Sequence, residues 1–120
     1  MSRPLVVVAL RQEAVRIVES GVDADVVITG PGKVSAALAT AAAIAQARPP
    51  FVVNAGTAGA LRDGLDGAHT VGRVVEHDFD HDGLEALLGE RLPGEIVLDD
   101  ASAVVLATGD RFVQEGGLRA

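Results

Sequence analysis

Residues 4–32 read PLVVVALRQEAVRIVESGVDADVVITGPG, and this stretch predicts the fold class. Residues 4–10 are continuously apolar and rich in valine, which is typical of a strand buried on both faces of a sheet. Residues 12–20 place apolar side chains on one helical face and stop at Gly21. Residues 25–29 predict a second buried strand, closed by Gly30-Pro31-Gly32. A strand, a helix and a strand in this order indicate a parallel strand pair covered by a helix.

The same alternation continues downstream. Residues 34–47 are rich in alanine and lack Gly and Pro, so they predict a long helix that Pro49-Pro50 ends. Residues 51–54 predict the next strand. Further strands are expected at residues 71–76, 95–98 and 103–108, with a short helix at 84–88. We therefore expect a single α/β domain over residues 1–120, with a mostly parallel mixed sheet flanked by helices and truncated at the C-terminus, where no closing element follows.

Composition excludes several classes of protein and site. Hydrophobic residues make up 48% and aromatic residues only 2%, so Val, Ala, Leu and Ile must build the core, with closely packed, alanine-rich helices. The net charge of −7 and the scattered basic residues argue against a nucleic-acid partner. The absence of cysteine excludes disulfides, thiolate metal sites and cysteine nucleophiles. The first apolar run is too short for a signal peptide or a membrane span, so we expect a cytoplasmic protein with no membrane partner.

Loops of small residues follow three of the predicted strands, and ligands bind beside the carboxyl ends of strands in open α/β sheets. Each loop taken alone is better explained as an ordinary tight turn. Two familiar glycine motifs are excluded, because Gly30-Pro31-Gly32-Lys33 lacks the spacing of a phosphate-binding P-loop and Val34 follows the lysine. Ser35 also stands where a dinucleotide fingerprint needs a third Gly or Ala.

Taken together, five motifs in order resemble one family. They are Ala9-Leu10-Arg11-Gln12-Glu13, Thr29-Gly30-Pro31-Gly32-Lys33-Val34, Asn54-Ala55-Gly56-Thr57-Ala58-Gly59, Glu76-His77-Asp78-Phe79-Asp80, and Ala107-Thr108-Gly109-Asp110-Arg111-Phe112. The chain resembles the purine nucleoside phosphorylase/uridine phosphorylase superfamily, and within it the methylthioadenosine/S-adenosylhomocysteine nucleosidases, over their N-terminal portion. It departs from them in the sixteen residues between Glu13 and Gly30, which leave no room for the usual strand pair, and in Pro31, where Ile is favoured.

The resemblance implies a nucleosidase that hydrolyses the N-glycosidic bond of a purine nucleoside, such as methylthioadenosine or S-adenosylhomocysteine. It implies that Glu13 orients and deprotonates the attacking water. Thr57, Ala58 and Gly59 would line the floor beneath ribose and base, Phe112 would stack on the purine, and the backbone of Val113 would meet its edge. It implies a homodimer, a small-molecule purine nucleoside as partner, and no cofactor or metal.

Simpler interpretations stand beside these roles. Glu13 is also explained as a charge favoured by the helix dipole at a helix N-terminus. Phe112 is also explained as a core residue. The segment HDFDHD at residues 77–82 suggests a metal site, but an extended backbone would point His77 and Asp78 to opposite faces.

The attacking nucleophile is the main open choice. The family's phosphorylases hold phosphate with a G-D-P-x-R motif, where this chain has Arg11-Gln12-Glu13, and a carboxylate there would repel phosphate and suit water. Arg11 and Arg16 keep a phosphorolytic purine nucleoside phosphorylase as the alternative, beside a futalosine-type hydrolase and a non-catalytic nucleoside-binding fragment. The family's Met-Glu motif, which holds ribose, and its Ser-Asp motif, which protonates the purine, lie beyond Ala120. We therefore expect the 120-residue chain by itself to be nearly inactive.

Overall fold

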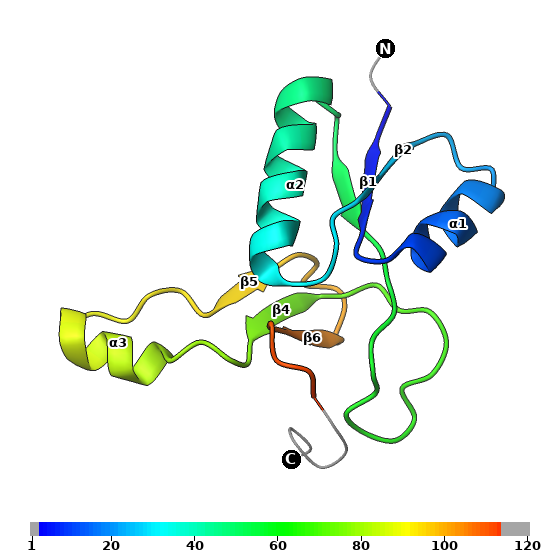
Figure 1. Cartoon of the computed structure of the whole chain (residues 1–120). Coiled ribbons are helices and arrows are strands. Elements are labelled where there is room, and N and C mark those ends of the chain that lie inside the picture. Colours follow the sequence, from blue (N-terminus) through cyan, green and yellow to red (C-terminus); the bar gives the residue numbers. More distant parts are fainter. Residues whose placement is uncertain (1–2, 114–120) are drawn as a thin grey trace. The chain divides into compact units, whose positions relative to one another are not determined.

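The computed structural model describes residues 3–113 of the chain. The described residues divide after Gly59 into two compact units, residues 3–59 and residues 60–113, each with its own three-stranded sheet (Figure 1). The two units are described separately below.

The first unit is a parallel sheet with strand order β2-β1-β3. Its elements are β1 (Leu5–Val8), α1 (Arg11–Glu19), β2 (Asp25–Ile28), α2 (Lys33–Ala47) and β3 (Val52–Asn54). In the centre, Leu5 pairs with Asp25 on one side and with Val52 on the other. Figure 1 shows α1 and α2 on either side of β1. The carboxyl ends of all three strands therefore lie at one edge of the sheet, followed by α1, α2 and the loop after Asn54.

The core of this unit is concentrated on β1. All four of its residues are buried, as the continuous apolar run predicts, and Ala14 of α1 and Ala24 pack beside it. The expectation of a second buried strand was wrong, because β2 is an edge strand and Ile28 is 47% exposed. Likewise α2 has no buried residue, although it was expected to pack closely. Only the central strand has a neighbour on each side, so only β1 is fully covered.

Backbone geometry explains where α2 begins and ends. Gly30 and Gly32 precede it with φ of +79° and +102°. Residues that carry a Cβ rarely adopt such values, so the Gly30-Pro31-Gly32 turn needs both glycines. Arg48 caps the C-terminus in the left-handed region at φ 47°, and Pro49-Pro50 follows.

The second unit is a mixed sheet with strand order β5-β4-β6. Its elements are β4 (Arg73–Glu76), α3 (His81–Leu88), β5 (Glu95–Val97) and β6 (Val105–Thr108). Strand β4 pairs antiparallel with β5 and parallel with β6, where Glu76 is opposite Thr108. At the start of β4, Gly72 is buried, and a Cβ there would collide with the carbonyl oxygen of Ser102.

The predicted elements are confirmed, with bounds that differ by a few residues at most. The α/β class with mostly parallel pairing and flanking helices is also confirmed, since β1 pairs parallel with β2 and β3, and β4 with β6. The strands are divided between two sheets, and residues 55–72, which connect them, form neither helix nor strand. No helix in the described part of the chain has the length and apolarity to cross a membrane.

Candidate active site

Glu13 occupies the first turn of α1, immediately beyond the carboxyl end of β1. Its Oε2 accepts hydrogen bonds from the backbone N–H of Thr57 at 2.8 Å and from the Thr57 hydroxyl at 3.1 Å. Its Oε1 accepts from the backbone N–H of Leu10 at 2.9 Å. Donors from the Leu10 turn and from the Thr57 loop therefore hold this carboxylate, and two residues that are 44 positions apart in the sequence meet at it.

Gly56 allows this approach. A Cβ atom at position 56 would lie 2.9 Å from Oε2 of Glu13, closer than carbon and oxygen normally come. The backbone of Gly56 has no positive φ, so the glycine is required by the neighbouring carboxylate and not by the conformation of the loop. The first of the two glycines in the Asn54–Gly59 motif thus makes room for the Glu13 carboxylate.

The hydrogen bonds keep Glu13 ionised. Partial burial acts to raise the pKa of this carboxyl, but the hydrogen bonds from Thr57 N–H, Leu10 N–H, the Thr57 hydroxyl and Ala9 N–H favour the anion. The net effect lowers the pKa of Glu13 below its usual range. At neutral pH the residue is a carboxylate that can accept a proton.

Glu13 makes two kinds of contact through its two carboxylate oxygens. Through Oε1 it caps α1, supplying one half of a capping box; Leu10 has no side-chain acceptor and cannot supply the other half. Through Oε2 it contacts Thr57, which no helix-capping role requires. The contact with the Thr57 loop distinguishes Glu13 from an ordinary charge at a helix N-terminus.

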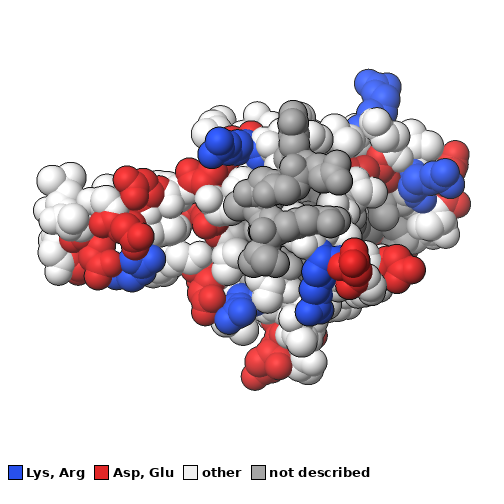
Figure 2. All heavy atoms as spheres, turned by 90° about the horizontal axis from the view of Figure 1, so that it is seen from below, with Lys and Arg blue, Asp and Glu red and all other residues white. Residues whose placement is uncertain are grey.

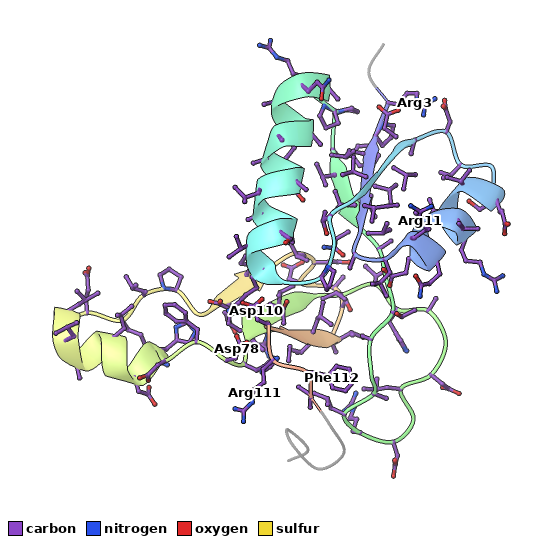
Figure 3. The ribbon with its side chains drawn as sticks, in the orientation of Figure 1. Arg3, Arg11, Asp78, Asp110, Arg111 and Phe112 are labelled. Atoms are coloured by element: carbon purple, nitrogen blue, oxygen red, sulfur yellow. The ribbon has the colours of Figure 1, made fainter. Side chains whose placement is uncertain are left out.

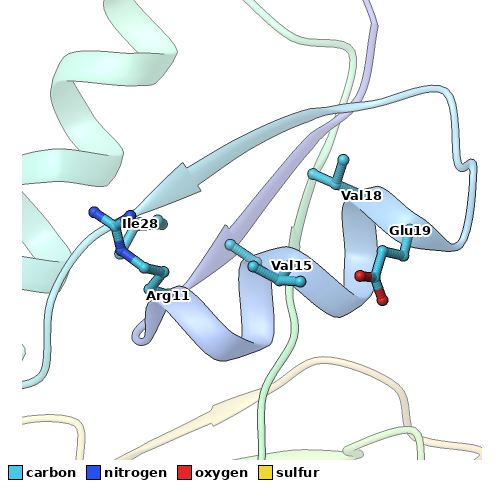
Figure 4. A pocket seen from close by; sticks show the side chains of 6 residues that line it. Arg11, Val15, Val18, Glu19 and Ile28 are labelled. Carbon is cyan, nitrogen blue, oxygen red and sulfur yellow. The ribbon is translucent and has the colours of Figure 1, made fainter.

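Arg11 belongs to a different surface. It lines a hollow of about 350 Å³ between α1 and β2, together with Val15, Val18, Glu19 and Ile28 (Figure 4). Residues two apart on a helix do not face each other, so Arg11 and Glu13 project from different sides of α1. The hollow is almost entirely apolar and the Glu13 carboxylate does not line it.

In the second unit, the loop after β6 is held by Asp78. Oδ2 of Asp78 accepts hydrogen bonds from the backbone N–H of Asp110 at 2.6 Å and of Arg111 at 3.0 Å. Figure 3 shows Asp78 and Asp110 close together, with Arg111 and Phe112 following along the chain. The H-D-x-D and G-D-x-F motifs thus meet at one carboxylate.

The remaining predicted binding residues lie in loops. Thr57, Ala58 and Gly59 are exposed after β3 in the first unit. Phe112 and Val113 follow β6 in the second unit, and Phe112 is 86% exposed. Within residues 3–113, Phe112 is therefore not packed into a core.

The His77–Asp82 segment has other functions than the metal site it suggested. Asp80 caps α3 by accepting from Gly83 N–H, His81 lies against Phe79 and 3.8 Å from Glu76, and Asp82 pairs with Arg91. Within residues 3–113, no three His, Asp or Glu side chains are grouped so that they could hold a metal ion.

One geometric expectation for this segment was wrong. Both His77 and Asp78 approach Gly109: a Cβ there would lie 2.6 Å from Nε2 of His77 and 2.6 Å from Cγ of Asp78. The chain bends directly after β4, so the alternation of an extended strand does not apply to these two side chains.

Acidic side chains are prominent on the surface, in line with the net charge of −7. Figure 2 shows acidic side chains gathered over the segment of α3, with a basic side chain among them. Asp82 and Glu85 form this group with Arg91, which contacts each at 2.8 Å. These contacts lower the pKa of Asp82, chiefly through its hydrogen bond from Arg91.

Comparison with known proteins gives the family. The sequence model of the phosphorylase superfamily matches residues 3–104, most of the chain. The chain belongs to the phosphorylase superfamily. The match includes four of the five motifs, from the Glu13 motif to the H-D-x-D segment, and ends one residue before β6.

Two similar proteins narrow the likeness within the superfamily. A 5′-methylthioadenosine/S-adenosylhomocysteine nucleosidase from Marinomonas sp. is 28% identical over an alignment of 116 residues in length. The alignment covers 79% of this chain and 50% of the relative. The crystal structure of such a nucleosidase from Neisseria meningitidis, in complex with methylthio-immucillin-A, matches with a TM-score of 0.70 at 25% identity. That match covers 97% of this superfamily member and 68% of the solved chain. The chain spans about half the length of the curated relative.

Sequence reasoning considered Asp78 only as a possible metal ligand and gave Gly56 no role of its own, although it quoted the motifs that contain them. The spacing held a signal for Asp78: it stands two residues after one strand, as Asp110 stands two residues after another, and parallel strands end at one edge. No comparable signal existed for Gly56, because its contact depends on how the Asn54–Gly59 loop turns toward α1.

Proposed function

We propose that this protein is a nucleosidase that hydrolyses the N-glycosidic bond of a purine nucleoside of the methylthioadenosine or S-adenosylhomocysteine type. The observation that carries the proposal is the ionised Glu13 carboxylate beside the Thr57 loop. The likeness to two proteins of that name supports the substrate class.

The proposed chemistry assigns Glu13 to the attacking water. Cleavage of an N-glycosidic bond passes through an oxocarbenium-like state, so the sugar must meet a nucleophile on the face opposite the departing base. Glu13 would orient the water and accept its proton as the water oxygen bonds to the anomeric carbon. The bond to the purine nitrogen breaks and its electron pair stays with the base, which takes a proton that the resemblance assigns to the Ser-Asp motif beyond Ala120. Glu13 then releases the proton of the water to solvent.

Thr57, Ala58 and Gly59 would form the floor under ribose and base. Thr57 already donates its N–H and hydroxyl to Glu13, so this binding loop and the proposed general base Glu13 are held in one arrangement. Phe112 would stack on the purine and the Val113 backbone would meet its edge. The exposed Phe112 ring suits this role, since a stacking residue must offer its face to the ligand.

Water is favoured over phosphate as the nucleophile. Glu13 places a negative charge where a phosphate would have to bind, and Arg11 lines the hollow on another side of α1. The resemblance adds a homodimer, and the sequence analysis adds a single domain and a cytoplasmic location; all three stay predictions.

The test is cleavage of methylthioadenosine by the full-length protein in phosphate-free buffer. We expect free adenine and the free methylthioribose sugar, with a rate that does not depend on added phosphate. Glu13→Gln should lower kcat by at least about 10²-fold, as expected for loss of a general base. Glu19→Gln, on the same helix, should leave kcat unchanged. A rate that needs phosphate and yields a sugar 1-phosphate would identify a phosphorylase instead.

A further inference from the structure

The parallel pairing of β4 and β6 places Asp78 opposite the start of the Phe112 loop. Glu76 is opposite Thr108 at the end of the ladder, and the backbone N–H of His77 still donates to the carbonyl of Thr108. Asp78 and Asp110 each follow two residues beyond this pair. The register of the two strands, which spans 32 residues of sequence, therefore brings the Asp78 carboxylate to the turn after β6.

Asp78 contacts this turn through the backbone. A single oxygen, Oδ2, accepts from two consecutive N–H groups, those of Asp110 and Arg111. Gly109 lies directly against the same carboxylate, at a place where a Cβ would collide with Asp78 and His77. The turn is fixed by a charged acceptor and by close packing at its glycine, immediately before the Phe112 ring.

The Phe112 ring makes little contact with the other residues that the structure describes. At 86% exposure, packing of the ring contributes little to its orientation. The position of the ring is therefore determined by the backbone of residues 109–111, which precedes it. A ring that is placed before the ligand arrives does not lose conformational freedom on binding, which favours affinity.

We propose that Asp78 is a positioning residue for purine binding: by accepting from Asp110 and Arg111 it holds the turn that presents Phe112 to the base. This inference rests on the proposed nucleosidase function and assigns a residue that the function itself does not name. Asp78 touches no reacting atom in this proposal and acts only through the loop.

The experiment is a double-mutant cycle on the full-length protein. Calorimetry measures the dissociation constant for methylthioadenosine. Turnover during the measurement is prevented by a low temperature or by placing all variants in a Glu13→Gln background. Phe112→Ala should weaken binding by about 5- to 150-fold, the range for loss of one base–aromatic stack. Asp78→Ala should weaken it by at least about 5-fold. In the Phe112→Ala background, Asp78→Ala should have no further effect, because the ring that it positions is gone.

Two further variants separate positioning from general stability. Asp78→Asn should restore affinity to within about 2-fold, because both hydrogen bonds go to one oxygen and an amide oxygen can accept both. Asp80→Ala removes the cap of α3 and should lower the melting temperature without changing the dissociation constant. Hydrogen exchange at the Asp110 and Arg111 amides should accelerate in Asp78→Ala and not in Asp80→Ala.

The outcomes separate the two proposals. If the wild-type protein binds methylthioadenosine but the effects of Asp78→Ala and Phe112→Ala add, the positioning role is wrong and the nucleosidase proposal stands. Unchanged exchange at both amides, or Asn as damaging as Ala, also overturns the positioning role. If the wild-type protein does not bind methylthioadenosine, the proposed function fails and this role in purine binding fails with it.

Discussion

Replacement of Gly56 by alanine tests the arrangement of Glu13 without changing the Glu13 side chain itself. A Cβ at position 56 would lie 2.9 Å from Oε2, whereas ordinary contact begins at 3.4 Å, so the carboxylate must move by about half an ångström. The obstacle is the end of a flexible side chain, and the backbone of Gly56 has no positive φ. The fold should accept the alanine while the catalytic group shifts.

The expected size follows from that displacement. A misplacement of about 1 Å can cost about 10²-fold in rate, so half that distance predicts a loss of about 10-fold in kcat. Stability should not fall, because alanine restricts the unfolded chain more than glycine and can add about 0.4–1 kcal/mol where the backbone allows it. A less active protein that melts at the same or a higher temperature is the expected result.

The assay is the initial rate of adenine release from methylthioadenosine by the full-length protein, with melting followed by circular dichroism. The same substitution in a Glu13→Gln background is the control, since Gly56→Ala acts through the carboxylate and should cost little there. Hydrogen exchange at the Thr57 amide should accelerate, because its 2.8 Å bond to Oε2 is lengthened. Unchanged kcat, or an equal loss in the background without the carboxylate, would refute the argument.

Two further outcomes are expected. Phe112→Ala should weaken the binding of methylthioadenosine by about 1–3 kcal/mol and leave the melting temperature unchanged, because the ring is 86% exposed; calorimetric titration measures the first and thermal unfolding the second, and unfolding on mutation would return Phe112 to the core. Wild-type protein should melt above Glu13→Gln at neutral pH, and the gap should narrow in acid. The folded pKa of Glu13 is lowered, so its contribution is present above the unfolded pKa of about 4.3 and is lost as the pH falls through the folded pKa. A gap that does not change between pH 7 and pH 3 would contradict the held carboxylate.

The sequence by itself determined the local elements. The buried run at β1, the stop of α2 before Pro49-Pro50 and the place of Glu13 in the first turn of α1 were all readable, because each depends on residues within one or two turns of chain. It also indicated the family, because five motifs kept their order. A helix was expected at residues 84–88, whereas α3 begins at His81 after its N-cap Asp80.

Tertiary structure decided burial and contact. Residues 25–29 have the apolar sequence of an inner strand, yet β2 lies at an edge, because the number of neighbours of a strand depends on the whole sheet. The approach of Gly56 to Glu13 depends on a loop turning toward a helix more than 40 residues earlier. Asp78 reaches Asp110 only through the register of β4 against β6. Local sequence sets backbone preference within a few residues, whereas these contacts arise from the pairing of distant strands, and only the folded chain specifies that pairing.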